Sequence, residues 1–137
     1  MTELGGRLPA MSLAVVGVAY ANKDGSDRGF EILLCKAGEP VALEPEPKNK
    51  KDENAVKVLS ARGVQIGYLT AERAPWLSRV LRSGRETTAV FQRKADWGAW
   101  IRVAFDGKVP VVAPEMEEGR DAEPEFYPDE VWPEGFE

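Results

Sequence analysis

At 137 residues, 43% of them hydrophobic, the chain is long enough to form one compact domain with a single core. It contains no histidine and one cysteine, which excludes triads that use histidine as the base, Cys–His proteases, histidine-ligated zinc sites and a disulfide framework. The net charge of -5 is unevenly divided, because residues 1–108 hold 17 basic and 13 acidic residues whereas residues 109–137 hold 1 and 10.

The beginning of the chain shows no targeting signal. The segment MTELGGRLPAMSLAVV lacks the basic region and the cleavage site of a signal peptide. No apolar run approaches the roughly 20 residues that are needed to cross a bilayer. We therefore expect a soluble intracellular protein without a membrane partner, cytoplasmic, with association with the nucleoid as an alternative.

The first third of the chain predicts two strands separated by a loop. Residues 12–20, SLAVVGVAY, are β-branched and apolar and end in an aromatic residue, which is typical of a strand. The turn-rich segment ANKDGSDRG follows. Residues 30–39, FEILLCKAGE, predict a second strand, in which Cys35 is expected to be buried rather than reactive. Residues 41–47 are expected to be extended because a residue before a proline avoids the helical region.

A hairpin and a helix come next. Residues 54–60 and 64–70 predict two paired strands that turn at Arg62-Gly63. The one predicted helix lies within residues 70–86, where Pro75 suits the first turn and Gly84 suits the end. The core-facing residues of this helix are expected to be Trp76, Leu77, Val80 and Leu81.

Residues 86–94 and 99–107 predict the last two strands. Five or six short strands with one helix indicate a mainly β protein, a small barrel of the OB or SH3-like kind. We place this barrel domain at residues 1–108 and an irregular acidic tail, without a periodic apolar face, at residues 109–137. Such charge asymmetry is typical of a body that binds a polyanion or of a tail that binds a partner; surface charge without a function is the alternative.

The connection before the first hairpin strand carries more functional groups than a turn needs. It reads EPEPKNKKDENAVKVL, residues 44–59. The cations of Lys48, Lys50 and Lys51 can neutralise phosphates. The carboxylate of Asp52 can accept a hydrogen bond from a terminal sugar hydroxyl. The alternatives are a solvated loop for the lysines and a turn-capping role for Asp52 and Asn54.

This loop and the following hairpin resemble the HIRAN domain, from about Val16 through Leu81. The residues that carry the resemblance are Glu46-Pro47, Asn49, Asp52, Asn54-Ala55-Val56, Val58, Gly63 and Gln65-Ile66-Gly67-Tyr68-Leu69. The resemblance implies a modified OB-like β-barrel that binds DNA. In eukaryotic remodelling ATPases of fork repair, such a domain captures the 3′ end of single-stranded DNA. It also implies a role in repair or recombination, beside a helicase or nuclease partner.

The resemblance extends to part of the end-binding pocket. In the family this pocket uses an arginine and an aromatic residue after the first strand, an asparagine, an aromatic and an aspartate in the loop, and a histidine in the second hairpin strand. Asn49 and Asp52 match, and Tyr20 takes the aromatic position after the first strand. The expected arginine, loop aromatic and histidine are replaced by Ala19, Lys51 and Tyr68. These departures argue against strict 3′-hydroxyl recognition and leave a general surface for single-stranded DNA.

Aromatic residues complete the predicted nucleic-acid-binding set. Tyr20 and Tyr68 can offer ring faces to unpaired bases, and such stacking is worth roughly 1–3 kcal/mol per base. Tyr68 shares its side of the strand with Ile66, so a core position is the alternative. We expect Trp97 to be exposed and Trp100 to be buried. The predicted set is Tyr20, Lys48, Asn49, Lys50, Lys51, Asp52, Tyr68 and Trp97.

The acidic tail carries its own hypotheses. Its aromatic residues are Phe126, Tyr127, Trp132 and Phe136. A negatively charged segment with spaced rings is chemically similar to single-stranded nucleic acid, so the tail could dock on the basic groove of its own barrel or bind a partner. A solubilising extension is the alternative. The whole chain could also be a protein-interaction or regulatory module that kept the barrel and lost DNA-end recognition.

We expect no enzymatic activity and no cofactor. A nuclease that binds a divalent metal through Glu44, Glu46 and Asp52 is the weakest hypothesis, because no additional carboxylate pair is present. A second group of basic residues is interpreted as a solvated face. It comprises Arg79, Arg82, Arg85, Arg93 and Lys94.

Overall fold

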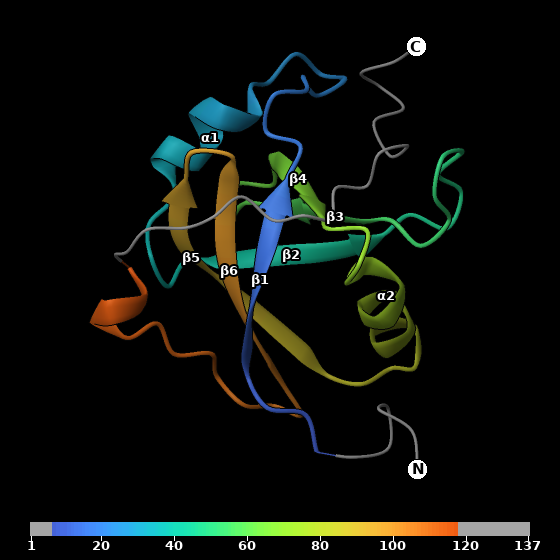
Figure 1. Cartoon of the computed structure of the whole chain (residues 1–137), viewed down its shortest axis with the longest axis vertical. Coiled ribbons are helices and arrows are strands. Elements are labelled where there is room, and N and C mark those ends of the chain that lie inside the picture. The colour runs from blue at the N-terminus through green and yellow to red at the C-terminus, as the bar shows by residue number, and fades with distance from the viewer. Residues whose placement is uncertain (1–6, 118–137) are drawn as a thin grey trace.

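The computed structural model describes residues 7–117 of the chain. Six antiparallel strands form a closed barrel in the order β1-β4-β3-β2-β5-β6, so the small β-barrel expected from the sequence is confirmed (Figure 1). The strands are β1 (Met11–Val16), β2 (Pro40–Pro45), β3 (Val56–Leu59), β4 (Gln65–Leu69), β5 (Thr87–Ala95) and β6 (Gly98–Phe105).

The predicted hairpins are both present. β3 pairs with β4, and β5 pairs with β6 along most of their lengths. β1 closes the barrel by pairing with β4 on one side and β6 on the other. The seam between β2 and β5 is short, because their paired residues are only Pro40 with Val90 and Val41 with Ala89.

Glycine permits a close contact between β1 and β4. Gly67 has φ +153°, and a Cβ built on it would lie 2.3 Å from the carbonyl oxygen of Val16. The close backbone approach that a glycine inside a strand indicates is thus observed here. The register of the β3–β4 pair also shifts between Val58 and Leu59, next to the Val58–Gly67 pair.

The predicted helix is confirmed as α2 (Ala74–Arg82), with a proline in its first turn. Leu77 and Val80 are fully buried, and Trp76 and Leu81 pack partly buried against the same core. Trp76 meets Phe105 edge to face, with ring centroids 5.9 Å apart. The helix therefore adds its apolar face to the barrel interior, which is filled by the inward-facing residues of all six strands.

The predicted second strand at residues 30–39 is wrong. Its first half belongs to a helix, α1 (Arg28–Leu34), which begins where the Asp27 carboxylate accepts a hydrogen bond from the backbone N–H of Phe30 at 2.8 Å. The buried residues of α1 are Arg28, Glu31 and Ile32. Its apolar residues Phe30, Leu33 and Leu34 are exposed, so the apolar run indicated the wrong element.

Cys35 follows α1 and is partly buried. Its Sγ lies 3.3 Å from the carbonyl oxygen of Glu31. Burial raises the pKa of the thiol to about 11. The thiol is therefore protonated at neutral pH, in agreement with the expectation of an unreactive cysteine.

The acidic tail is described only as far as Glu117, and it contains a single turn of 3₁₀ helix, η1 (Pro114–Met116). The predictions for Phe126, Tyr127, Trp132 and Phe136 lie outside the described residues, and the division at residue 108 stays a prediction.

The helices of the described chain are α1, α2 and η1. None of these three is long and apolar enough to span a membrane.

Candidate nucleic-acid interface

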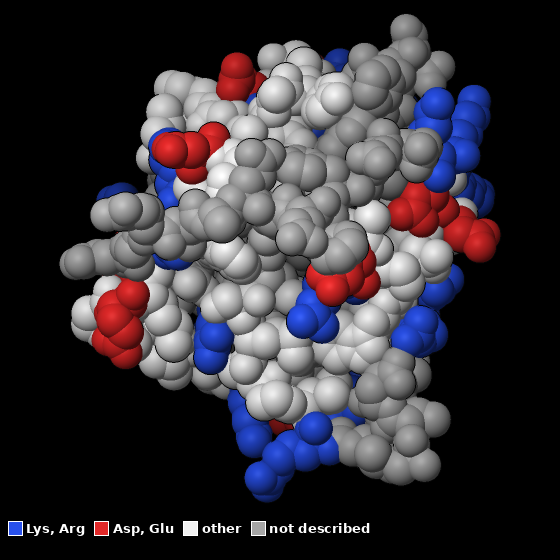
Figure 2. Space-filling view, viewed as in Figure 1, with Lys and Arg blue, Asp and Glu red and all other residues white. Residues whose placement is uncertain are grey.

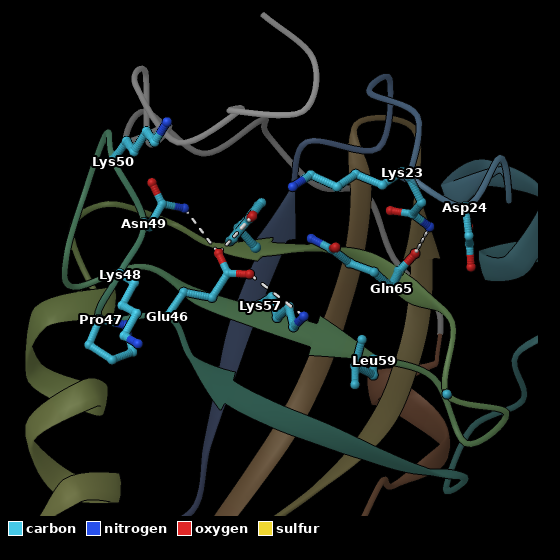
Figure 3. Close-up of a pocket in the computed structure, with 13 residues that line it drawn as sticks. Lys23, Asp24, Glu46, Pro47, Lys48, Asn49, Lys50, Lys57, Leu59 and Gln65 are labelled. Atoms are coloured by element: carbon cyan, nitrogen blue, oxygen red, sulfur yellow. Dashed lines mark hydrogen bonds and ion pairs between the residues drawn. The ribbon is translucent and has the colours of Figure 1, made fainter. Parts of the chain in front are cut away.

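A groove of about 720 Å³ opens on one side of the barrel (Figure 3). Residues 22–24, in the loop after β1, form one wall, and residues 46–50, in the loop after β2, form the other. β3 and β4 supply the floor. The lining residues are Asn22, Lys23, Asp24, Glu46, Pro47, Lys48, Asn49, Lys50, Lys57, Leu59, Gly63, Gln65 and Tyr68.

Glu46 holds the second wall to the floor. Its Oε1 accepts hydrogen bonds from the Tyr68 hydroxyl at 2.9 Å and from the Asn49 side-chain amide at 3.0 Å. Its Oε2 lies 3.6 Å from Nζ of Lys57, which also lies 3.8 Å from Glu44. The carboxylate charge is therefore balanced locally, and both of its oxygens already have partners.

Asn49 and Asp52 shape the loop. The side-chain oxygen of Asn49 accepts hydrogen bonds from the backbone N–H groups of Lys51 and Asp52, at 2.8 and 3.1 Å. The Asp52 carboxylate accepts one from the backbone N–H of Asn54 at 2.8 Å. The turn-capping role considered for Asp52 is confirmed. Asn49 lines the groove, but Asp52 does not.

Arg28 supports the first wall from inside the protein. It is 1% exposed. Its Nε donates to the side-chain oxygen of Asn22 at 2.7 Å, and Nη1 donates to the carbonyl of Gly17 at 3.0 Å. Asn22 in turn donates to the carbonyl of Gln65 on β4 at 2.9 Å. This chain of bonds fixes the loop after β1 on the floor of the groove.

Arg28 is absent from the predicted set, because the sequence pattern placed it in a loop ahead of a strand. The available signal was Asp27, a residue type that favours the N-cap of a helix. Once the helix begins there, Arg28 lies in its first turn and its side chain is buried.

Tyr68 occupies the core position that the sequence left as an alternative. It is 1% exposed and packs with Val16 and Ala55. The guanidinium carbon of Arg28 lies 5.7 Å from its ring centroid, a cation–π contact. A base in solution has no access to a ring enclosed in this way, so the predicted stacking role of Tyr68 is wrong.

Tyr20 and Trp97 are partly exposed and pack against the cluster of Val16, Ala55 and Tyr68. Neither of the two lines the groove. Trp97 meets Trp100 edge to face, with ring centroids 5.4 Å apart. The expected contrast between an exposed Trp97 and a buried Trp100 is wrong, because both rings are half-buried. The two rings that keep accessible surface next to the groove floor are thus Tyr20 and Trp97.

The rim of the groove is basic. Lys23, Lys48 and Lys50 are exposed, line the groove and form no ion pair with any residue between 7 and 117. Figure 3 shows Lys23 extending from one wall toward the side that carries Asn49 and Lys50. Lys51 is exposed but does not line the groove. Lys23 was absent from the predicted set because it lies in a different loop, 25 positions before Lys48.

Elsewhere, basic and acidic side chains are interspersed over much of the visible face outside the grey atoms (Figure 2). In the second group of basic residues, Arg85 donates to both carboxylate oxygens of Asp106, at 2.8 and 2.9 Å. This contact lowers the pKa of Asp106. Arg85, whose side chain is 14% exposed, is therefore engaged in a structural ion pair, and the interpretation of the whole group as a solvated face stays a prediction.

The three carboxylates considered for a nuclease are used in other ways. Glu44 and Glu46 share Lys57, and Asp52 caps a turn. Between residues 7 and 117, no three His, Cys, Asp or Glu side chains gather as a metal site would require.

Comparisons with known proteins show which family and which fold this chain shares. The HIRAN domain model matches residues 10–108. Helicase-like transcription factor from Oryctolagus cuniculus is 46% identical over 43 residues, which make up 31% of this chain and 4% of that protein. The chain therefore spans only a small part of this curated relative.

Two solved structures share the fold. The crystal structure of the HIRAN domain of human HLTF matches with a TM-score of 0.56 and 25% identity, over 70% of this chain and 74% of that one. A protein from Lactobacillus plantarum matches with a TM-score of 0.54 and 18% identity, over 70% of this chain and 97% of that one. The second likeness concerns the fold alone.

Proposed function

The chain belongs to the HIRAN domain family, and from this premise we propose that it binds single-stranded DNA along the lysine-rimmed groove. HIRAN domains are DNA-binding modules. The observation that carries the proposal for this chain is the meeting of Lys23, Lys48 and Lys50, from two separate loops, on one groove. Cations held around a groove neutralise the phosphates of a strand that follows it.

The accessible rings supply a second contribution. Tyr20 and Trp97 pack on the same small cluster as Tyr68, which lines the groove floor. A strand whose backbone follows the lysines could place unpaired bases against these rings, at roughly 1–3 kcal/mol per stacked base. Duplex bases are already stacked, so this contribution favours single strands.

The biological setting follows from the relatives. One carries the name helicase-like transcription factor, which makes a helicase a natural partner for this module. We place the chain in DNA repair or recombination, where unpaired strands and strand ends arise.

The test is the salt dependence of binding. Affinity for an internally labelled 20-nucleotide single strand would be measured by fluorescence anisotropy at several salt concentrations. Three phosphate contacts to a single strand contribute about -2 to the slope of log K against log salt. The variant Lys23→Gln/Lys48→Gln/Lys50→Gln should lose this contribution and bind about thirtyfold more weakly at low salt.

The matched control removes the same charge from exposed sites outside the groove. These are Lys36, Lys94 and Lys108, each changed to Gln. The control should retain most of the affinity and the slope. Equal losses in the two triple variants would show that the groove is not the binding site, and tighter binding to a duplex of the same sequence would exclude the single-strand preference.

One observation favours a second function, a protein-interaction module. Phe30, Leu33 and Leu34 on α1 are 62%, 63% and 43% exposed. An exposed apolar group of this kind is typical of an interaction surface. Pull-down from nuclease-treated extract separates the two functions, because a partner bridged by nucleic acid is lost and a direct partner that requires Phe30 and Leu33 is retained.

A further inference from the structure

A second hollow, of about 240 Å³, lies at the end of the barrel where the chain enters β1 and leaves β6. Its lining comes from residues 7–10 ahead of β1, from the end of β6 and from residues between 108 and 116. Two of the lining residues, Val109 and Val111, are 78% and 67% exposed. Figure 2 shows Lys and Arg side chains gathered at this end of the molecule, at the bottom of the view. The hollow therefore combines exposed apolar surface with positive charge.

Three cations line the hollow without a carboxylate to balance them. They are Arg7, Arg102 and Lys108, and none of the described lining residues is acidic. None of the three forms an ion pair with any residue between 7 and 117. Asp106, which lies close to Lys108 in sequence, is already bound through both carboxylate oxygens by Arg85. A site with this charge favours an anionic occupant.

Arg102 is held at the hollow by a network of hydrogen bonds. Its Nη1 donates to the Ser12 hydroxyl at 2.9 Å, and this hydroxyl donates to Oε1 of Gln92 at 2.7 Å. The Nε2 of Gln92 donates to the carbonyl oxygen of Met116 at 3.2 Å. The buried Nε of Arg102 has no hydrogen-bond partner in the part of the chain that the structure describes. One network thus fixes both a cation with unused binding capacity and the point from which the chain continues beyond the barrel.

We propose that residues 118–137 of the same chain dock in this hollow, with the rings of Phe126 and Tyr127 against the exposed valines. The segment contains eight acidic residues and one basic residue, so its charge is opposite to that of the hollow. The two rings lie between Glu125 and Asp129. A bound ring buries apolar area, and the flanking carboxylates can pair with the guanidinium and ammonium groups. This inference does not depend on DNA binding.

The position of the hollow favours this segment as its occupant. Met116, which lines the hollow, is separated from Phe126 by only nine residues. Closing so short a loop costs little entropy, and a short tether gives an effective concentration on the order of millimolar. The lysine-rimmed groove suits the segment less well, because Asp24 and Glu46 line it and its floor ring is enclosed.

Hydrogen exchange of the full-length chain, followed by mass spectrometry, tests the docking. At low salt, the amides of residues 122–130 should exchange about tenfold more slowly than the same amides in a synthetic peptide of residues 118–137. High salt should reduce this protection, because it screens exposed ion pairs. Equal exchange in the chain and the peptide would overturn the inference. Protection that rises with protein concentration would also overturn it, because the occupant would then be the segment of a second copy.

Two exposed cations show whether the protection belongs to the hollow. Arg7→Gln/Lys108→Gln should remove most of it, whereas Lys36→Gln/Lys94→Gln, with the same change in charge outside the hollow, should retain it. Protection that survives in Arg7→Gln/Lys108→Gln would contradict the inference. Protection that is lost only in the triple lysine variant of the groove would place the segment there instead.

A second pair of variants tests the rings. Phe126→Ser/Tyr127→Ser should exchange like the free peptide, because the apolar contact with the valines is removed. Trp132→Ser/Phe136→Ser removes the same number of rings farther along the segment and should leave the protection of residues 122–130 in place. The opposite result would show that the assignment of Phe126 and Tyr127 to the hollow is wrong.

Discussion

Tyr68 on the floor of the groove, Glu46 on one wall and the buried Arg28 satisfy one another or their neighbours through short contacts, and we group these three residues as the floor. At the rim, Lys23 and Lys50 extend from the surface without an ion pair to any residue in the described part of the chain. The two regions lie side by side but have different tasks. Groups on the floor are committed to stability, whereas groups at the rim remain available to a ligand.

The contrast explains why residue type alone is a poor guide to a binding role. Asn49 and Asp52 match the family pattern, yet their described hydrogen bonds shape the loop. Substitutions on the floor should therefore reduce the stability of the fold, and substitutions at the rim should reduce DNA affinity alone.

The largest expected effect belongs to Gly67→Ala. The new Cβ would lie 2.3 Å from the carbonyl oxygen of Val16 on the neighbouring strand, at a φ of +153° that side chains rarely adopt. We expect a loss of about 4 kcal/mol in the free energy of unfolding, measured by urea denaturation.

Gly84→Ala is the matched control, because Gly84 also has a positive φ, +85°, but a Cβ there would meet nothing within 4 Å. Gly84→Ala should lower the free energy of unfolding by only about 1 kcal/mol, because of backbone strain. Equal costs at the two positions would show that close strand contact does not set the stability of the floor.

The next largest effect is expected for Arg28→Leu. The substitution leaves the carbonyl of Gly17 and the side-chain oxygen of Asn22 without their donor, and it removes the contact with the Tyr68 ring. Unsatisfied buried polar groups cost about 1–3 kcal/mol each, so we expect a loss of about 3 kcal/mol.

Lys50→Leu removes the same charge at the rim. Its free energy of unfolding should change by less than about 0.5 kcal/mol, because exposed substitutions of this kind are nearly neutral. If Lys50→Leu destabilised the protein as much as Arg28→Leu, the separation between floor and rim would be refuted.

Tyr68→Phe tests the hydroxyl alone. The ring and its packing remain, and the 2.9 Å hydrogen bond to Glu46 is lost. One such bond to a charged acceptor contributes about 1.5 kcal/mol, which thermal and chemical denaturation should detect. An unchanged free energy of unfolding in Tyr68→Phe would contradict the role of Glu46 as a fixed acceptor.

The smallest effect distinguishes two lysines that both line the groove. Lys57 lies within 4 Å of Glu44 and Glu46, whereas Lys48 has no such pair with the described residues. Lys57→Met should lower stability by about 0.5 kcal/mol, as for a partly exposed ion pair, and Lys48→Met should leave it unchanged. A double-mutant cycle of Lys57 with Glu46 measures this coupling, and zero coupling energy would place Lys57 with the rim rather than the floor.

Much of the fold could be predicted because its local patterns agree with the barrel. The alternation in Val56–Leu59 and the apolar face of the helix at Ala74–Arg82 match their burial in the structure, whereas the last four residues of Gln65–Leu69 are all buried. α1 could not be predicted from such a pattern, because it buries Arg28 and Glu31 and exposes Phe30 and Leu33. The pattern is inverted because the buried charges serve polar contacts with loops rather than the core.

The site was predictable only where it is continuous in sequence. Lys48, Asn49 and Lys50 lie in one loop that the sequence predicts to bind nucleic acid, and all three line the groove. The opposite wall, with Lys23 supported by Arg28, comes from a distant segment that meets this loop only when β1 pairs with β4. The burial of Tyr68 depends on that same contact, so the sequence left its position open.

The short seam between β2 and β5 is one of two places where the barrel should open most readily, because β1 and β4 also share only two residue pairs. Two residue pairs join β2 and β5, and Pro40, in one of them, has no N–H to donate. β5 and β6 share eight pairs. Amide hydrogen exchange should therefore be faster along this seam than between β5 and β6. Because β2 continues directly into the wall that carries Glu46, transient opening of the seam would also loosen one side of the groove.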